Sequence, residues 1–183
     1  DPNRKNFYQQ TLRTAYELTD ATNIALLSLK TSAMYYDRIR TFAIQPAKSY
    51  SELQMQLETF TEDVSTAPLL YHEEKRLKAE MEKIYQSHES ALSELFDKTW
   101  VTSFWTDNEA KEAMEILQSM LVSTQDLAVM VSAVTLSLLR VFDHKKFNFL
   151  LEAYKHEALQ VSQRAIVGIV IAISKHEKRI ALY

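Results

Sequence analysis

Two long apolar segments dominate the second half of this sequence, at residues 127–142 and 161–174. In both segments apolar side chains recur on more than one side of a helix, which is typical of helices buried among others. The segment between them, residues 145–157, has an apolar and a polar face. The pattern therefore predicts two buried helices joined by an amphipathic helix.

The first part of the chain also shows helical spacing. Residues 3–18 and about 20–42 are predicted to form two helices, or one long helix, because no Gly or Pro separates them. Ser49 and Glu52 have the spacing of a capping box that opens a further helix. We expect that helix to end near Pro68, since proline lacks the N–H that continues a helix.

A long helix is predicted near residues 70–100, where no residue type stops a helix. Its apolar positions alternate steps of three and four, as in a seam that packs along another long helix. Self-association through this helix is therefore one possibility. The seam of this helix consists of Leu77, Met81, Ile84, His88, Leu92 and Leu95. After this helix, a second capping box, at Thr106 and Glu109, opens the next one.

The last part of the chain contains an internal repeat. A shift of 32 residues aligns the second apolar segment with the first, and a shift of 33 aligns the helices that precede them. Two helix–turn–helix units of equal length and matching register indicate a helical repeat whose hairpins stack. The aligned pairs are Val129/Val161, Ala133/Ala165, Val134/Ile166, Leu138/Val170, Leu139/Ile171 and Val141/Ile173, then Met114/Phe147, Ile116/Phe149, Leu117/Leu150 and Leu121/Tyr154.

Residues 107–177 resemble the HEAT-repeat family of α-solenoids. Residues 149–174 carry the resemblance: Leu-Leu in a first helix, a short turn, then Val161 and Ala165 opening an apolar second helix. The resemblance implies a curved stack of antiparallel helices that serves as a protein-binding scaffold. The usual turn proline is absent and Arg164 is shifted by two positions, so the family's ion pair at the turn does not carry over.

Composition supports helices and narrows the function. The chain has one Gly, three Pro and no Cys, so Gly-dependent β-turns, disulfides and thiolate zinc sites are not expected. A formal net charge of −3 with interspersed signs makes nucleic acid an unlikely partner. No apolar run reaches the ~20 residues that span a bilayer, so we expect a soluble chain without a membrane span. The compartment stays open, with the cytoplasm favoured.

No catalytic, cofactor-binding or metal-binding site is predicted. His72 has no second His one turn later, as a zinc-binding helix requires. Gly168, the only glycine, lies inside an apolar segment, where it indicates close approach of a neighbouring helix rather than a phosphate-binding loop. An enzyme on this scaffold would instead gather polar groups from both halves, for example around Tyr36, Asp37 and Arg38.

The candidate partner-binding residues are aromatic and basic. Trp100, Phe104 and Trp105 form the densest aromatic group, and such residues anchor many interfaces. Filling the junction between the two halves of the chain is the alternative role for them. Arg140, Arg164 and Lys175 can line a weakly basic surface. The predicted partner-binding residues are Trp100, Phe104, Trp105, Arg140 and Arg164.

These patterns together predict an all-α protein. A helical N-terminal region, residues 1–105, precedes stacked antiparallel hairpins of HEAT-like α-α superhelix type at residues 106–183. The predicted function is a non-catalytic scaffold or adaptor for a protein partner; the alternative is a nucleic-acid-processing or other enzyme module on a HEAT-like solenoid. The start without Met and the apolar tail suggest a piece of a longer protein whose repeats continue past Tyr183, with a removed leader as the alternative explanation for the missing Met.

Overall fold

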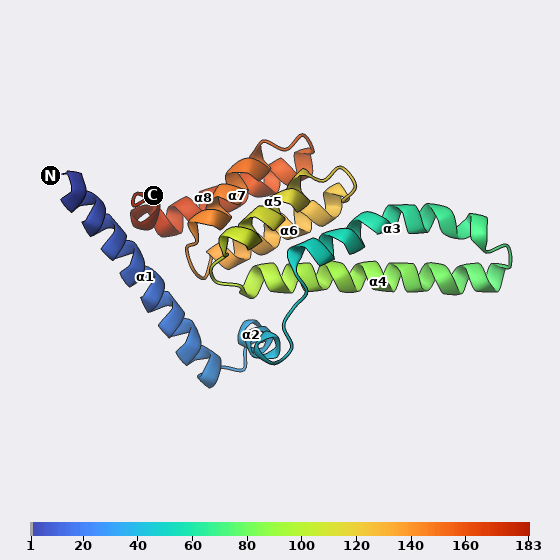
Figure 1. Ribbon diagram of the computed structural model, residues 1–183, viewed down its shortest axis with the longest axis horizontal. Coiled ribbons are helices and arrows are strands. Elements are labelled where there is room, and N and C mark those ends of the chain that lie inside the picture. Colours follow the sequence, from blue (N-terminus) through green and yellow to red (C-terminus); the bar gives the residue numbers. More distant parts are fainter. Residues whose placement is uncertain (1) are drawn as a thin grey trace.

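Helices account for all regular secondary structure that the computed structural model shows in residues 2–183, the part of the chain it describes (Figure 1). This confirms the all-α fold class that the scarcity of Gly and the apolar periodicity predict. The helices are α1 (Pro2–Lys30), α2 (Met34–Ile44), α3 (Tyr50–Leu70), α4 (Glu74–Val101), α5 (Asp107–Gln118), α6 (Thr124–Leu138), α7 (His144–Tyr154) and α8 (Leu159–Ile180).

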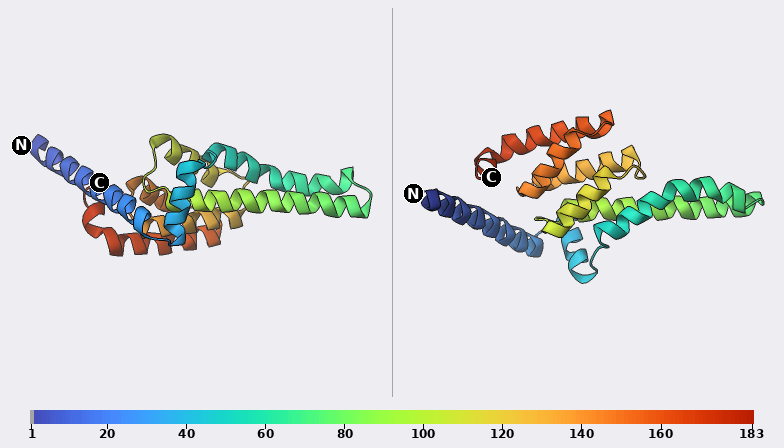
Figure 2. Two further views of the ribbon diagram at one scale, coloured as in Figure 1. Left: turned by 90° about the horizontal axis from the view of Figure 1, so that it is seen from below. Right: turned by 45° about the horizontal axis from the view of Figure 1, so that its top comes forward.

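The last six helices form two layers. Helix α5 packs between α3 and α7, and α6 packs between α4 and α8. Helices α3 and α4 form one hairpin across the layers, and α7 and α8 form another (Figures 1 and 2). Because α6 has a neighbour on each side as well as α7 across the layers, its apolar residues are covered nearly all round. The position explains why the first apolar segment has no polar face.

One hydrophobic core crosses the boundary that the sequence suggests at residue 105. Leu53 of α3 and Leu95 of α4 belong to the same buried cluster as Met130 of α6, Phe149 of α7 and Ala165 of α8. These side chains are all less than 2% exposed. The α3–α4 hairpin is therefore packed as a continuation of the two layers and has no separate core at its inner end.

The seam of α4 is covered within the chain. Near its middle the His88 ring stacks on Phe60 of α3, with ring centres 3.9 Å apart. At its inner end Leu95 packs in the main core with Leu57 of α3. The outer part of the hairpin projects away from the other helices as an arm (Figure 1). The prediction of a long partner helix for the seam is met by α3.

Helices α1 and α2 form a corner on one side of the layers. Tyr35 and Tyr36 of α2 pack with Val101 of α4 in a small cluster separate from the main core. The Arg40 guanidinium donates to the carbonyls of Ser28 and Thr31, so it satisfies acceptors at the end of α1. Figure 1 shows α1 leaving this corner at an angle to the other helices.

The far part of α1 is held by the C-terminal end of the chain. Asp20 pairs with Arg179, and Glu17 accepts a hydrogen bond from the Tyr183 hydroxyl at 3.2 Å. Arg13 lies over the Tyr183 ring, 4.2 Å from its centre. These polar contacts replace the apolar packing that α1 lacks, since Leu18 remains 67% exposed.

The helix boundaries test the local predictions. Both capping boxes are present, with Ser49 and Thr106 accepting from the backbone of the glutamate three residues later. The predicted stop at Pro68 is wrong, since α3 runs through it to Leu70 at the tip of the arm, where solvent can bind the carbonyl that proline leaves free. The break between α1 and α2 lies at residues 31–33, without a Gly or Pro signal.

No helix in residues 2–183 is both long and apolar enough to cross a membrane. This agrees with the expected absence of a membrane span. The apolar stretch of α8 is instead used for packing: a Cβ built on Gly168 would lie 2.9 Å from Leu150 Cδ1 of α7 and closer still to the Thr135 hydroxyl of α6. The close approach of neighbouring helices predicted at Gly168 is therefore confirmed.

Candidate functional site

The two tryptophans near the end of α4 have different surroundings. Trp105 is 2% exposed and packs in the main core against Tyr50 and Phe149, with ring centres 5.7 and 5.6 Å away. Its indole N–H donates to the Tyr50 hydroxyl at 2.8 Å. Trp105 therefore fills the junction between the halves of the chain, which is the alternative role that its sequence position allows. Phe104 is partly buried in the same connector.

A buried lysine closes this junction. The Lys146 ammonium donates to the carbonyls of Thr99 and Thr102 and to the Ser137 hydroxyl, at 2.8 Å for Thr99 and 2.6 Å for Ser137. The two carbonyls are at the C-terminal end of α4, where the helix has acceptors without partners. Burial lowers the pKa of Lys146 to about 7, against the opposing charges of Asp143 and Glu109.

Asp143 joins the connector to α7 in the same junction. Its carboxylate accepts from the backbone N–H of Trp105 at 2.9 Å and from that of Lys145 at 3.0 Å. The Lys145 ammonium returns a bond to the Trp105 carbonyl at 2.9 Å. Every polar group in the junction described here has a hydrogen-bond partner inside the chain. The junction therefore stabilises the fold and leaves none of these groups free to bind a ligand.

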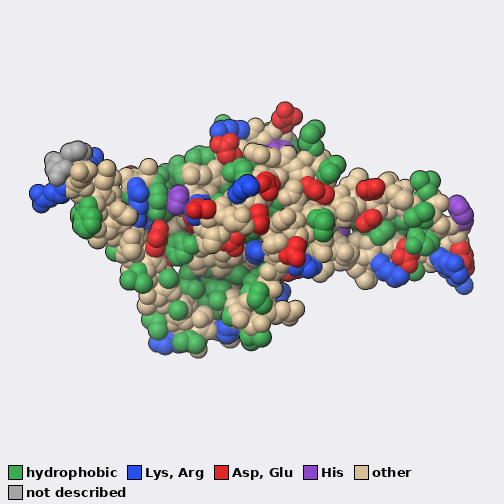
Figure 3. All heavy atoms as spheres, in the orientation of Figure 1, with side chains coloured by type: hydrophobic (Ala, Val, Ile, Leu, Met, Phe, Trp, Pro, Cys, Tyr) green, Lys and Arg blue, Asp and Glu red, His purple; other side chains and the backbone are tan. Residues whose placement is uncertain are grey.

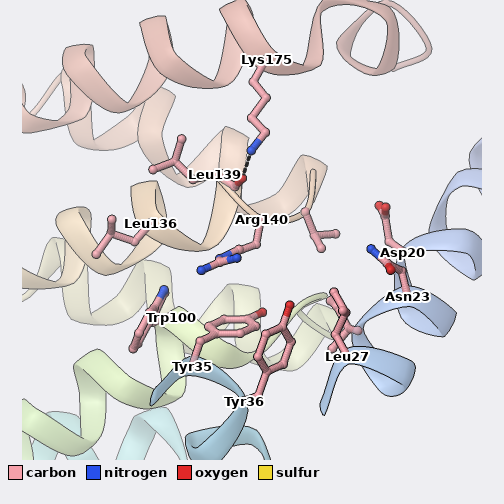
Figure 4. A pocket seen from close by; sticks show the side chains of 12 residues that line it. Asp20, Asn23, Leu27, Tyr35, Tyr36, Trp100, Leu136, Leu139, Arg140 and Lys175 are labelled. Carbon is pink, nitrogen blue, oxygen red and sulfur yellow. Dashed lines mark hydrogen bonds between the residues drawn. The ribbon is translucent and has the colours of Figure 1, made fainter. Parts of the chain in front are cut away.

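An open cleft lies between the α1–α2 corner and the two layers (Figure 4). It has a volume of about 480 Å³ and is lined from five helices and the turn after α6. Hydrophobic side chains are gathered in the hollow beside the corner (Figure 3). The residues that line it are Asp20, Asn23, Ile24, Leu27, Tyr35, Tyr36, Trp100, Leu136, Leu139, Arg140, Val141 and Lys175.

Aromatic rings form one wall of the cleft. Trp100 is partly buried, and its ring meets Tyr35 edge-on with centres 5.3 Å apart. The Tyr36 ring meets Tyr35 at 5.1 Å. Burial raises the pKa of the Tyr35 hydroxyl, while a hydrogen bond from Ser103 and the charge of Arg140 act in the opposite direction. The raised pKa keeps the Tyr35 hydroxyl neutral beside the cleft.

Two cations line the cleft together with the aromatic wall. The Arg140 guanidinium lies 5.1 Å from the centre of the Tyr35 ring. Lys175 reaches across from α8 and donates to the Leu139 carbonyl at the end of α6 (Figure 4). The acid in the cleft, Asp20, is paired with Arg179 and so is already neutralised. The cleft thus combines an aromatic surface with positive charge, an arrangement that suits an anionic or acidic group.

The structure brings only two of the predicted binding residues together here. Trp100 and Arg140 line the cleft, whereas Trp105 is in the core and Phe104 does not line the cleft. Arg164 lies further along α8, where it donates to the Ser132 hydroxyl of α6 at 2.7 Å. It lines a second hollow of about 580 Å³ between α6 and α8.

The polar cluster considered for an enzyme does not converge. Tyr36 faces the cleft, but Asp37 pairs with Arg40 on the same helix, and Arg38 pairs with Asp97 of α4 at 3.0 Å. Each charge is thus used in packing the α1–α2 corner. No group of three or more His, Asp or Glu side chains in the described residues is arranged to hold a metal ion.

Several important residues carry no local sequence signal. Lys146 follows another lysine in an amphipathic segment, where both read as surface residues, yet only Lys145 is even partly exposed. Tyr35 joins the cleft because α2 turns back onto α4, and no sequence feature near residues 31–33 indicates that turn.

Comparison of the chain with known protein families, curated proteins and solved structures finds no match.

Proposed function

We propose that this chain is a non-catalytic helical-repeat scaffold, of HEAT-like type, that binds a protein partner in the cleft beside Trp100 and Arg140. The observation that carries the proposal is the cleft itself: the partly buried Trp100 ring, backed by the buried Tyr35 and Tyr36 rings, lies beside cations that have no carboxylate partner. Aromatic and Arg side chains supply most of the binding energy at protein interfaces.

The burial pattern supports a repeat. In the pairs related by 33 residues, Ile116 and Phe149 are both buried, as are Leu117 and Leu150. In the pairs related by 32, buried Val134 corresponds to Ile166, which is 44% exposed. The difference follows from position, because α6 has helices on both sides in its layer and α8 has one in the described structure. Stacked units share this property, with outer units exposing what inner units bury.

The charge of the cleft supports a protein partner over nucleic acid. Only Arg140 and Lys175 contribute cations to its lining, and the whole chain carries a formal charge of −3. A nucleic-acid interface neutralises several phosphates and needs a larger basic surface. A site with two cations beside aromatic rings has the composition expected of a binding site for a short segment of another protein.

The test is affinity capture from the source cells with the wild-type chain and two cleft variants. Trp100→Ala removes the aromatic wall, and Arg140→Gln removes a charge from an exposed side chain without touching the core. We expect each variant to lose the captured protein, with about 30-fold weaker binding for a tryptophan at an interface hot spot.

Tyr154→Ala is the matched control. Tyr154 is an aromatic residue of α7, 52% exposed and outside the cleft. Circular dichroism and urea unfolding should show that all three variants remain folded. If folded Trp100→Ala and Arg140→Gln chains capture the same proteins as the wild type, the cleft is not the binding site and the proposal fails.

A further inference from the structure

The cleft continues along the surface between α6 and α8. Leu136 of α6 lines both the cleft and the second hollow, so the two meet at this side chain. Beyond Leu136 the second hollow is lined by Ser132 on α6 and by Arg164 and Val167 on α8. We call the continuous surface the α6–α8 groove and define it by Ser132, Leu136, Arg140, Arg164, Val167 and Lys175.

Helix periodicity places these residues in two facing stripes. Ser132 and Leu136 are four residues apart on α6 and share one face, and Arg140 follows four residues later in the turn directly after the helix. Arg164 and Val167 share a face of α8, and continued helical steps bring Lys175 to the same face. At about 1.5 Å per residue, Arg164 and Lys175 are roughly 16 Å apart along α8.

Charge is concentrated at the two ends of the groove, and the middle is apolar. Arg164 is at one end; Arg140 and Lys175 are at the other. Between them lie Leu136, 38% exposed, and Val167, 56% exposed. The groove therefore presents cation, apolar surface and cation in sequence.

None of the three cations is neutralised within residues 2–183. Arg164 donates to the Ser132 hydroxyl, Lys175 to the Leu139 carbonyl, and Arg140 lies over the Tyr35 ring. No carboxylate of the described chain forms an ion pair with any of them. Because Arg has five N–H donors and Lys has three, each of these exposed cations keeps donors for a carboxylate of another molecule.

We propose that the α6–α8 groove binds an acidic polypeptide segment of a partner protein, with carboxylates at both ends and an apolar side chain between them. The inference rests on the proposed scaffold function and adds the chemistry of the partner. A span of roughly 16 Å corresponds to about five residues of extended chain. The acidic residues of such a segment are then separated by about four or five positions.

A polypeptide fits this surface better than a nucleic acid. Successive phosphates would meet the apolar side chains of Leu136 and Val167 in the middle of the groove and would lose hydrating water against them. An apolar side chain placed there gains from burial, at about 25 cal/mol per Å² of apolar surface. The order of cation, apolar surface and cation along the groove thus favours a segment that has an acidic, an apolar and an acidic side chain in the same order.

The test uses displayed random peptides of about 12 residues, long enough to cross the groove in extended form. Peptides are selected on the wild-type chain, and their binding is measured by fluorescence anisotropy. They are compared on two variants that each remove three positive charges. The groove variant carries R140Q, R164Q and K175Q, because glutamine keeps hydrogen-bonding capacity without charge.

The control variant carries R4Q, K5Q and K75Q. These three side chains are exposed, lie outside the groove and form no ion pair in the described structure. Both variants therefore lower the net charge equally, so general electrostatic attraction is matched. A labelled single-stranded oligodeoxynucleotide of similar length serves as the competing probe.

We expect enriched peptides to carry Asp or Glu on both sides of an apolar residue. Their binding should weaken about tenfold to a hundredfold on the groove variant, remain within about twofold on the control variant, and weaken with added salt. Enriched peptides without this pattern, or binding that is equal on both variants, would overturn the inference while leaving a protein-binding scaffold in place. Oligonucleotide binding without peptide enrichment would overturn both proposals, and enrichment of no peptide would overturn the inference.

Discussion

Two lysines, Lys146 and Lys175, each bind backbone carbonyls at the C-terminal end of a helix, yet their environments are opposite. Lys146 is fully buried and reaches the end of α4, where Thr99 and Thr102 supply carbonyls. Lys175 is exposed and reaches the end of α6 at Leu139. The same interaction therefore serves a closed junction in one place and the edge of an open cleft in the other.

The tryptophans follow the same division. Trp105 donates its N–H to Tyr50 within the core, whereas Trp100 faces the cleft with Tyr35. Only five positions separate them, but α4 ends at Val101 and the chain turns between them. Residue type does not distinguish core from surface here. What distinguishes them is how deeply the fold buries each side chain: Trp105 and Lys146 are buried, Trp100 is partly exposed and Lys175 is exposed.

The largest expected effect concerns Trp105. Trp105→Ala should lower the free energy of unfolding by about 3–5 kcal/mol, because it opens a cavity between Tyr50 and Phe149 and removes a buried hydrogen bond. Trp100→Ala, at a partly buried site, should cost clearly less. Urea unfolding followed by circular dichroism measures both. Equal losses for the two variants would show that the core and cleft are not energetically distinct.

Lys146 is the second test of the closed junction. Lys146→Met keeps an unbranched side chain but leaves two carbonyls and the Ser137 hydroxyl without their donor. We expect a loss of about 2–4 kcal/mol in urea unfolding. Lys175→Met removes one carbonyl contact at an exposed site and should cost less than about 1 kcal/mol. If Lys175→Met lowers the free energy of unfolding more than Lys146→Met does, burial does not determine how much these hydrogen bonds contribute to stability.

The pH dependence of stability sharpens the same comparison. Burial lowers the pKa of Lys146 to about 7 in the folded chain, against 10.5 for an ordinary lysine. Between these values the unfolded state binds the extra proton, so the free energy of unfolding should rise with pH from about 7 to about 10. Lys146→Met should lack this component of the slope. Identical slopes would mean that the three acceptors keep the buried ammonium charged.

The sequence predicts the parts that depend on local chemistry. The capping boxes at Ser49 and Thr106 are specified by residues three positions apart, so they are recognised without knowledge of the fold. The buried role of Lys146 depends on the end of α4, which is 44 to 47 residues away in the chain. Such tertiary partners override the surface preference of lysine, and no local pattern reveals them.

Gly168 tests how α8 is seated beneath the groove. Gly168→Ala gains up to about 1 kcal/mol of helix propensity, but its methyl group would meet Thr135 and Leu150 too closely. The Thr135 hydroxyl is held by the Val131 carbonyl at 3.0 Å, so it is not free to turn away without losing that bond. We expect a net loss of about 1–2 kcal/mol in urea unfolding. Val167→Ala, next to it but 56% exposed, is the control and should change stability by less than about 1 kcal/mol.

The smallest expected effect concerns the contact that holds α1 over the cleft. Asp20→Asn removes the ion pair with Arg179, in which both side chains remain partly exposed to solvent. The free energy of unfolding should fall by less than about 1 kcal/mol, since ion pairs near a protein surface contribute little. The substitution should nevertheless speed up amide hydrogen exchange along α1 relative to the wild-type chain, and leave exchange in α6 unchanged. The reason is that α1 has few apolar contacts to hold it.

Glu74→Gln provides the control, as it breaks the exposed pair with Lys78 on the distal arm and should change exchange in neither α1 nor α6. Faster exchange confined to α1 would mean that the wall of the cleft opens while the two layers stay closed. Unchanged exchange would mean that the corner at α2, where Arg40 binds the end of α1, is sufficient to fix the wall. Binding in the cleft would then require no movement of α1, and the closed and open regions would differ in exposure alone.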